Sequence, residues 1–140
     1  MIHNILKNIG SYNGEMTVSQ VIRFFDGFGM HFTKTMIQNY VRIGIIPPPA
    51  KKRYYLKKHI ILLALIYEFK EIYSLPDIGK LFEAYIESVD DSLLIKLYED
   101  FHGLYDKCYN LTIHKKILPL MVQSVVNKKI VKNMMDNDDL

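Results

Sequence analysis

Three consecutive prolines, Pro47–Pro49, constrain the fold of this chain more than any other feature of its sequence. Each proline ring fixes φ and removes a backbone N–H, so neither a helix nor a central strand can pass through this segment. Gly44 stands just before the prolines and favours a helix end. The sequence therefore predicts that one helix ends near residue 44 and that a stiff loop follows it.

Apolar residues recur at helical spacing on both sides of the prolines. We expect helices to begin near Thr17, at Thr33 and at Ser74. Thr17 or Ser19 can cap the first of them, because their side-chain oxygens can accept bonds from free backbone N–H groups, as can those of Thr33 and Ser74. The helix that Thr33 caps is expected to run to about Ile43. The fold class is therefore mainly α. Further helices are expected over 57–73, over 94–108 and after Pro119, and a small β-ribbon is expected around 45–56.

The net charge of +3 is small, but the charges are separated along the chain. Residues 27–67 contain seven Lys or Arg residues and no Asp or Glu, whereas residues 68–112 contain ten acidic residues and four lysines. A solvated surface usually mixes the two signs, so this separation indicates that residues 27–67 meet a polyanion. We also expect His59 to add part of a positive charge to this stretch at neutral pH.

The acid-free stretch carries its polar side chains on two neighbouring elements. On the helix from 33 to 43, Ile37 and Tyr40 share the apolar side, and the opposite side is polar and basic. The segment after the prolines is basic and aromatic. Such donors can bind phosphates and base edges of DNA. The candidate contact residues are Thr33, Lys34, Thr35, Gln38, Asn39, Arg42, Lys51, Lys52, Arg53, Tyr55, Lys57 and Lys58.

The same stretch resembles the N-terminal DNA-binding domain of MerR-type transcription regulators. The matching segments are IQNYVRIGI over 37–45, Pro47, KRYY over 52–55 and SLPDI over 74–78. The whole chain is also similar to an uncharacterised bacterial family, the YkrK-type proteins. The resemblance implies a cytoplasmic bacterial transcription regulator.

Three positions depart from the MerR-type motif. Gln38 stands where that family has a helix arginine, Lys52 stands at the first wing tyrosine, and Ile72 replaces a glycine. Arg53 and Tyr55 match the wing pair that the family directs at the DNA backbone. Phosphate binding is therefore better supported by these residues than the reading of a particular base sequence.

The resemblance implies a MerR-like winged helix-turn-helix over 17–82, with an N-terminal extension over 1–16 and a C-terminal helical segment over 83–140. Its helix 33–43 would lie in the major groove of double-stranded DNA, with the wing 47–56 on the phosphate backbone.

The C-terminal segment is expected to pair two chains into a homodimer. Apolar residues recur at helical spacing over 94–108, and one helix pair rarely buries so many large side chains by itself. Dimerisation would set the spacing between two half-sites on the DNA.

Two other functions fit the same pattern. With Gln38 in place of arginine, the winged helix could lack DNA affinity and recruit an acidic protein partner as an interaction module. The C-terminal helices could instead hold an effector, although the residue pattern identifies no small-molecule ligand. The candidate lining residues of that pocket are Tyr98, Phe101, Tyr105 and Met121.

The sequence contains no motif for catalysis, a cofactor or a metal: a Gly-rich phosphate loop, a nucleophile elbow and paired metal-binding histidines are all absent. Cys108 is the single cysteine, so one chain can form no internal disulfide. The longest apolar run, Ile60–Tyr67, is far shorter than the about 20 residues that a membrane-spanning helix needs. With no secretion signal, we expect a cytoplasmic protein that is not an enzyme.

Overall fold

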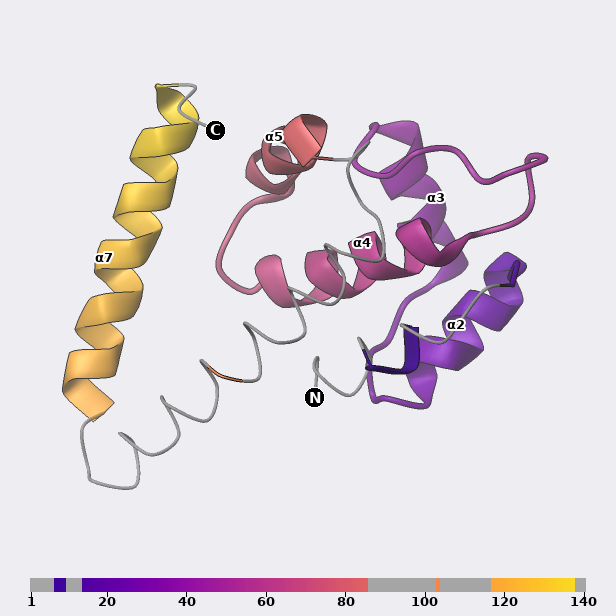
Figure 1. The fold of residues 1–140 in the computed structure, drawn as a ribbon, viewed down its shortest axis with the longest axis horizontal. Helices are drawn as coiled ribbons and strands as arrows, with labels where there is room; N and C mark the ends of the chain where they lie inside the picture. Colours follow the sequence, from indigo (N-terminus) through magenta and orange to yellow (C-terminus); the bar gives the residue numbers. More distant parts are fainter. Residues whose placement is uncertain (1–6, 10–13, 86–102, 104–116, 138–140) are drawn as a thin grey trace.

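The computed structural model describes residues 7–9, 14–85, 103 and 117–137 of the chain. The mainly helical fold class is confirmed for these residues, whereas the helix expected over 94–108 lies outside them except for residue 103. The helices are α2 (Val18–Asp26), α3 (Lys34–Arg42), α4 (Lys57–Phe69), α5 (Leu75–Tyr85) and α7 (Ile117–Asp136). Figure 1 shows α4 in the middle of the molecule, with α2 and α3 toward one end and α7 at the other.

Three of the helices begin at the capping residues that the sequence predicts. At the start of α2, the Thr17 N–H donates to Gln20 Oε1 at 2.9 Å and the Gln20 N–H donates to Thr17 Oγ1 at 3.4 Å. The Thr33 hydroxyl accepts a bond of 3.1 Å from the first turn of α3, and the Ser74 hydroxyl accepts one of 3.3 Å from that of α5. These bonds satisfy backbone N–H groups that a helix start leaves without partners.

Helix α4 forms the centre of the hydrophobic core. Because it is apolar on nearly every side, seven of its thirteen residues are buried. Aromatic rings from α2 and from the segment that follows it extend this core. The ring centroids of Phe25 and Phe32 lie 4.8 Å apart, and those of Phe32 and of Tyr67 on α4 lie 5.8 Å apart. The chain before α2 also reaches the core, since Ile9 is fully buried.

Two helix ends show how local chemistry decides a boundary. After α3, Gly44 adopts φ +82°, a left-handed conformation that a residue with a Cβ rarely takes. Helix α4 ends at Phe69, four residues before the expected end at Tyr73. There the N–H groups of Ile72 and Tyr73 both bond to the Phe69 carbonyl, so the chain turns before α5 begins.

The segment between α3 and α4, residues 47–56, is called the wing loop below. The described residues contain no β-sheet, and the β-ribbon expected around 45–56 is represented only by two isolated antiparallel bridges. One bridge joins Ala50 to Tyr54 within the loop, and the other joins Met16 to Tyr55. Prolines at 47–49 offer no N–H groups, so a longer ladder cannot form on that side of the loop.

Helix α7 contacts the rest of the described structure through α5. Met135 is buried, and Lys132 Nζ lies 2.8 Å from a carboxylate oxygen of Asp77. The Lys80 ammonium also donates to the Met135 carbonyl. An apolar cavity of about 220 Å³ remains between these helices, lined by Phe69, Tyr73, Ile78, Leu81, Val131 and Met135.

The effector pocket considered from the sequence cannot be placed, because Tyr98, Phe101 and Tyr105 lie outside the described residues. The fourth lining candidate, Met121, is exposed on α7. Among the described helices, none has the length and apolar character needed to cross a membrane.

Substitution of Ile61 by Ala tests the central position of α4. Ile61 is buried, so Ile61→Ala should lower the free energy of unfolding by about 2–5 kcal/mol. Ile72→Ala is the matched control, because Ile72 is 52% exposed and should cost less than about 1 kcal/mol. Urea denaturation followed by circular dichroism measures both, and equal losses would contradict the assignment of the core.

Candidate nucleic-acid interface

The outer side of α3 presents polar and basic side chains in one strip. Lys34, Thr35, Gln38 and Arg42 are exposed, and helical geometry places these positions within about 100° around the helix axis. The opposite side is buried, because Ile37 and Tyr40 pack into the core. The burial of Tyr40 confirms its prediction as a core residue.

Two of the candidate residues on α3 have structural roles as well. Thr33 is exposed, but its hydroxyl caps the helix, so it fixes where α3 begins. Asn39 is half-buried, and its side-chain oxygen accepts a hydrogen bond from the Arg42 guanidinium. That bond holds Arg42 against the last turn of α3 while leaving its other donors available.

The tip of the wing loop is a tight turn made by three cationic residues. The Arg53 N–H donates to the Ala50 carbonyl at 3.1 Å, and Ala50 and Tyr54 exchange backbone bonds of 2.7 and 2.9 Å. Between them, Lys51 and Lys52 both have positive φ, +53° and +63°. The side chains of Lys51, Lys52 and Arg53 are all exposed.

The backbone of this turn is strained. Two successive residues with positive φ are typical of a type I′ turn, which strongly favours Asn and Gly. A left-handed conformation costs an ordinary L-residue about 1–2 kcal/mol, and such strain is found preferentially at functional positions. Lysine at both positions is therefore unfavourable for stability, while it places two ammonium groups at the tip of the loop.

Arg53 is held against an aromatic ring of the same loop. Its guanidinium carbon lies 5.0 Å from the centroid of the Tyr54 ring, within the range of a cation–π interaction. The contact restricts the arginine side chain, so less conformational entropy is lost when it binds an anion.

Tyr55 is a core residue and not a surface contact, so its inclusion among the candidate DNA-binding side chains is wrong. It is 5% exposed, and its ring lies edge-on to His59 with centroids 5.4 Å apart. Its backbone exchanges bonds of 2.7 and 3.0 Å with Met16. Burial raises the pKa of the Tyr55 phenol. The sequence around Tyr55 could not reveal this burial, because the residue that pairs with it, Met16, lies before α2.

His59 also differs from its expected role as part of the basic surface. It is 1% exposed. Among the described residues, it is the one polar or charged residue that is buried. Burial lowers the pKa of its imidazole, which favours the neutral ring, and the bond to the Pro48 carbonyl only partly opposes this effect. His59 therefore adds no charge to the surface at neutral pH.

The start of α4 adds two lysines next to the wing loop. Lys58 is exposed and Lys57 is half-buried. The first turn of α4 contains no acidic residue, and the same holds for the first turns of α2 and α3. The positive ends of these helix dipoles are thus not offset by local carboxylates, as they often are in other proteins.

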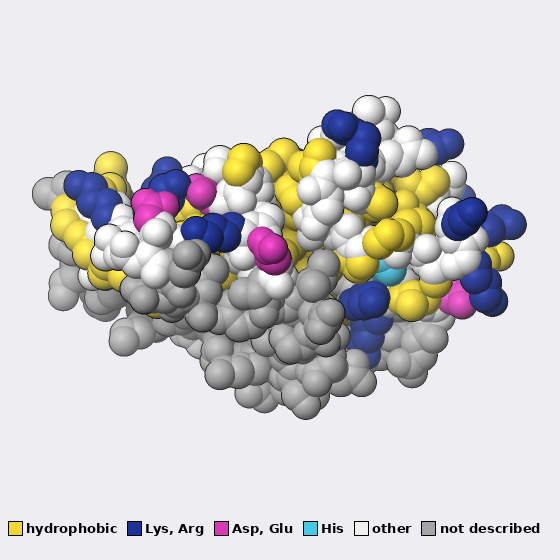
Figure 2. All heavy atoms as spheres, turned by 90° about the horizontal axis from the view of Figure 1, so that it is seen from above, with side chains coloured by type: hydrophobic (Ala, Val, Ile, Leu, Met, Phe, Trp, Pro, Cys, Tyr) yellow, Lys and Arg dark blue, Asp and Glu magenta, His cyan; other side chains and the backbone are white. Residues whose placement is uncertain are grey.

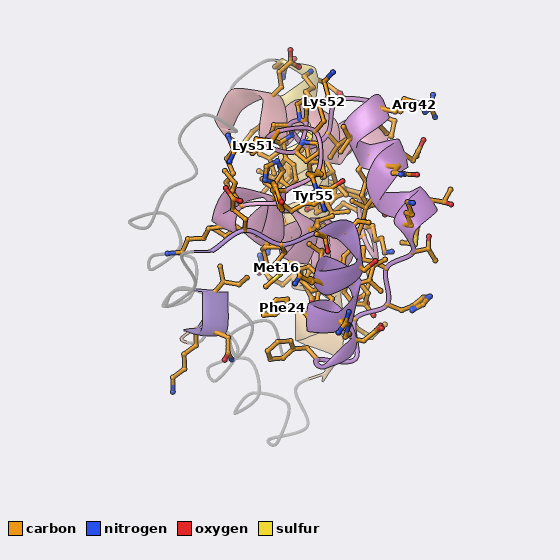
Figure 3. The ribbon with its side chains drawn as sticks, turned by 90° about the vertical axis from the view of Figure 1, so that its right-hand side faces the viewer. Met16, Phe24, Arg42, Lys51, Lys52 and Tyr55 are labelled. Atoms are coloured by element: carbon orange, nitrogen blue, oxygen red, sulfur yellow. The ribbon has the colours of Figure 1, made fainter. Side chains whose placement is uncertain are left out.

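Several cations of this region have no carboxylate partner among the residues that the structure describes. Within the described part of the chain, Lys34, Lys51, Lys52 and Lys58 form no ion pair. Figure 3 shows Arg42, Lys51 and Lys52 in the same upper part of the view, with Tyr55 nearer the centre. In Figure 2 the acidic side chains are seen mainly over the left half, away from most of the basic groups on the right.

Comparison with protein families gives one match. A family described as a domain of unknown function, DUF1836, matches residues 13–108, which is more than half of the chain. The protein belongs to the DUF1836 family. No curated protein and no solved structure matches the chain.

The DUF1836 match begins before α2 and therefore includes Met16, whose backbone pairs with Tyr55. It includes the whole of α3, the wing loop and α4, so the candidate interface lies entirely within the family domain. Helix α7 lies after the matched residues. No group of three or more His, Cys, Asp or Glu side chains that could hold a metal ion occurs among the described residues.

Replacement of Lys51 by Asn and Lys52 by Gly tests the strain in the turn. Asn and Gly accept positive φ more readily, so the double variant should unfold at higher urea concentration, by about 1–2 kcal/mol. The double variant Lys51→Gln, Lys52→Gln is the control, since it removes both charges and keeps the backbone strain. If the glutamine variant is stabilised equally, charge crowding rather than backbone conformation is responsible.

Proposed function

We propose that this DUF1836 protein is a DNA-binding transcription regulator of the bacterial cytoplasm, with a MerR-like winged helix-turn-helix. In this proposal α3 enters the major groove and the wing loop lies on the phosphate backbone of double-stranded DNA. The observation that carries the proposal is that both elements present exposed cations with no carboxylate partner among the described residues. A polyanion would supply the partners that the described part of the chain does not.

The exposed strip of α3 supports this assignment. The major groove is about 12 Å wide and accommodates an α-helix, whose exposed side chains can then reach base edges. Gln38 can contact adenine through two hydrogen bonds, and Arg42 can contact either guanine or a phosphate. Lys34 and Thr35 lie in the first turn, and groups at a helix N-terminus can contact phosphates or base edges.

The wing loop supports a contact with phosphates. Its tip presents Lys51, Lys52 and Arg53 together, and the turn gives their backbone a defined conformation before binding. Phosphate contacts of this kind position a protein on the duplex but carry no base sequence directly. Each one releases condensed counterions, so the affinity should fall steeply with salt concentration.

Helix α7 supports the homodimer as part of the same proposal. The C-terminal end of α7 packs on α5, yet several apolar residues along the helix remain 41–60% exposed among the described residues. A helix that carries apolar residues all round is normally buried all round. A second copy of the chain would cover this surface and place two winged helices for adjacent half-sites. The exposed residues are Met121, Val122, Val125, Val126, Ile130 and Met134.

The alternative function, an interaction module that binds an acidic protein, is supported by the same cations and by Gln38. The two functions differ in their expected dependence on salt and on DNA. A protein partner would not require an affinity for duplex DNA of random sequence, whereas a DNA-binding regulator has such an affinity at low salt.

Titration of a fluorescent random-sequence duplex at several salt concentrations tests the proposed function. Wild-type protein should bind the duplex at low salt, and the logarithm of its binding constant should fall linearly with the logarithm of the salt concentration. Lys51→Gln, Lys52→Gln should reduce that slope by about 0.9 for each phosphate that the variant no longer neutralises. Arg42→Ala should weaken binding by about 5- to 150-fold, corresponding to a loss of about 1–3 kcal/mol.

The control for this titration is Lys128→Gln, Lys129→Gln, which removes two exposed lysines from α7. Its affinity and slope should remain close to those of the wild type. An equal loss in this control would indicate nonspecific attraction by any lysine. Absence of wild-type binding at low salt would favour the interaction module.

Sedimentation tests the homodimer. Wild-type protein should sediment as a dimer at micromolar concentration, and Val122→Asp, Val126→Asp should shift it to a monomer because charges would then face the apolar surface. Ile72→Asp is the control, since Ile72 is similarly exposed but does not lie on α7. A wild-type monomer over the same concentrations would contradict the proposed assembly.

A further inference from the structure

The wing loop is closed at its base by one buried histidine. His59 lies in the first turn of α4, and both nitrogens of its imidazole have backbone partners. Nδ1 accepts from the Leu56 N–H at 2.9 Å, and Nε2 lies 3.1 Å from the Pro48 carbonyl oxygen. These two bonds are called the His59 clasp below. They connect Pro48, on the leg before the tip of the wing loop, with Leu56, on the leg after it.

The clasp requires one form of the ring. Because Nδ1 accepts a bond, the hydrogen must be on Nε2, which then donates to Pro48. A protonated ring carries hydrogen on both nitrogens, so it cannot accept from the Leu56 N–H. Only the neutral Nε2–H form of His59 makes both bonds.

The surrounding chain offers few other ways to close the loop. The prolines at 47–49 donate no backbone bonds, so this leg of the loop cannot pair with a strand through N–H groups. Leu56 precedes α4 at the capping position, and its side chain has no oxygen to accept from the helix start. His59 acts on both legs at once, which a capping Ser or Thr could not do.

We infer that His59 is the positioning residue of the wing loop, and that its neutral clasp holds Lys51, Lys52 and Arg53 in the geometry that binds DNA. The inference rests on the proposed function for its DNA-binding consequence. The clasp itself is a property of the loop and can be measured without DNA. Loss of the clasp frees the leg at Pro48, so the cations at the tip no longer have a fixed direction.

Protonation should open the clasp. Two groups lie near the ring in the described structure. The charge of Lys58 also lowers the His59 pKa. The Tyr55 phenol, whose pKa is raised by burial, is neutral at neutral and acidic pH. Because the folded pKa is depressed, the clasp contributes its full stability above the ordinary histidine pKa of about 6.5. That contribution is lost progressively as the pH falls from there toward the lower pKa of the folded protein.

The sign of the pH effect separates the clasp from ordinary electrostatics. A surface histidine that gains a proton adds positive charge and should strengthen binding to DNA as the pH falls. Opening of the clasp should weaken binding over the same range. His31 provides the comparison, because its side chain is 76% exposed.

The experiment compares wild type, His59→Gln and His31→Gln between about pH 8 and pH 5 at constant ionic strength. The glutamine introduced by His59→Gln can still accept from the helix start, as Gln20 does in α2, but it replaces the rigid imidazole by a flexible, non-titrating amide, so the bond to Pro48 should be weakened. Duplex affinity of wild type and His31→Gln should fall by about threefold or more on acidification. His59→Gln should bind more weakly near pH 8 and show no such fall. If the duplex affinity of the wild type rises on acidification in parallel with that of His59→Gln, the inference is overturned.

Two measurements without DNA keep the test independent of the proposed function. Ring ¹⁵N chemical shifts of the wild type should show His59 as the neutral Nε2–H tautomer at neutral pH. Trypsin should cut after Lys51, Lys52 or Arg53 several-fold faster in His59→Gln than in His31→Gln, with both variants equally folded. An Nδ1–H tautomer, or equal cleavage rates, would overturn the clasp. Absence of DNA binding with both results as expected would overturn only the proposed function.

If His59→Gln does not fold, the wild type decides the question alone. Its tryptic cleavage at the wing loop, corrected for the pH dependence of trypsin on an unfolded substrate, should accelerate as the His59 ring protonates. Constant cleavage through that titration would overturn the inference.

Discussion

Helix α4 has to be covered on nearly every side, and the positions of the neighbouring elements follow from that requirement. Seven of its thirteen residues are buried, and exposure of so much apolar surface would cost far more than the net stability of a small domain. Helices α2, α3 and α5 and the base of the wing loop provide the cover. Each turns its apolar side toward α4, so the polar strip of α3 faces outward as a direct consequence.

The wing loop can retain a strained tip because its base is anchored in this same core. Tyr55 is buried and pairs with Met16, and His59 bonds to Pro48 from within α4. The unfavourable backbone of Lys51 and Lys52 is therefore a local cost, offset by burial elsewhere. A loop without these anchors would relax the turn and lose the arrangement of its cations.

The sequence predicts those features that depend on neighbouring residues. The caps at Thr17, Thr33 and Ser74 and the buried side of α3 follow from short-range hydrogen bonding and from helical periodicity. The exposed candidates of α3 and of the turn were also found in this way, because cations and polar groups on the side away from apolar residues stay in solvent.

Features that depend on distant residues could not be predicted. Tyr55 is in the core because Met16 pairs with it, and His59 is neutral because Pro48 and Leu56 bond to it within a buried site. The β-ribbon expected around 45–56 is reduced to two isolated bridges, and one of them depends on Met16, which lies far from Tyr55 in the sequence. The early end of α4 likewise reflects the turn needed before α5 rather than the apolar pattern, which continues past it.

The lysines of α7 and those of the wing loop differ in their surroundings, and this contrast bears on the proposed interface. Where α7 meets α5, Lys132 pairs with Asp77, and its hydrogen bond lowers the pKa of that carboxyl. The chain can thus place a carboxylate beside a lysine where two elements pack. At the turn of the wing loop no carboxylate is provided among the described residues, and Lys51 and Lys52 occupy backbone conformations that other residues adopt more easily. Stability alone explains neither choice. The proposed contact with DNA would explain both, because a polyanion attracts exposed cations that have no carboxylate partner among the described residues.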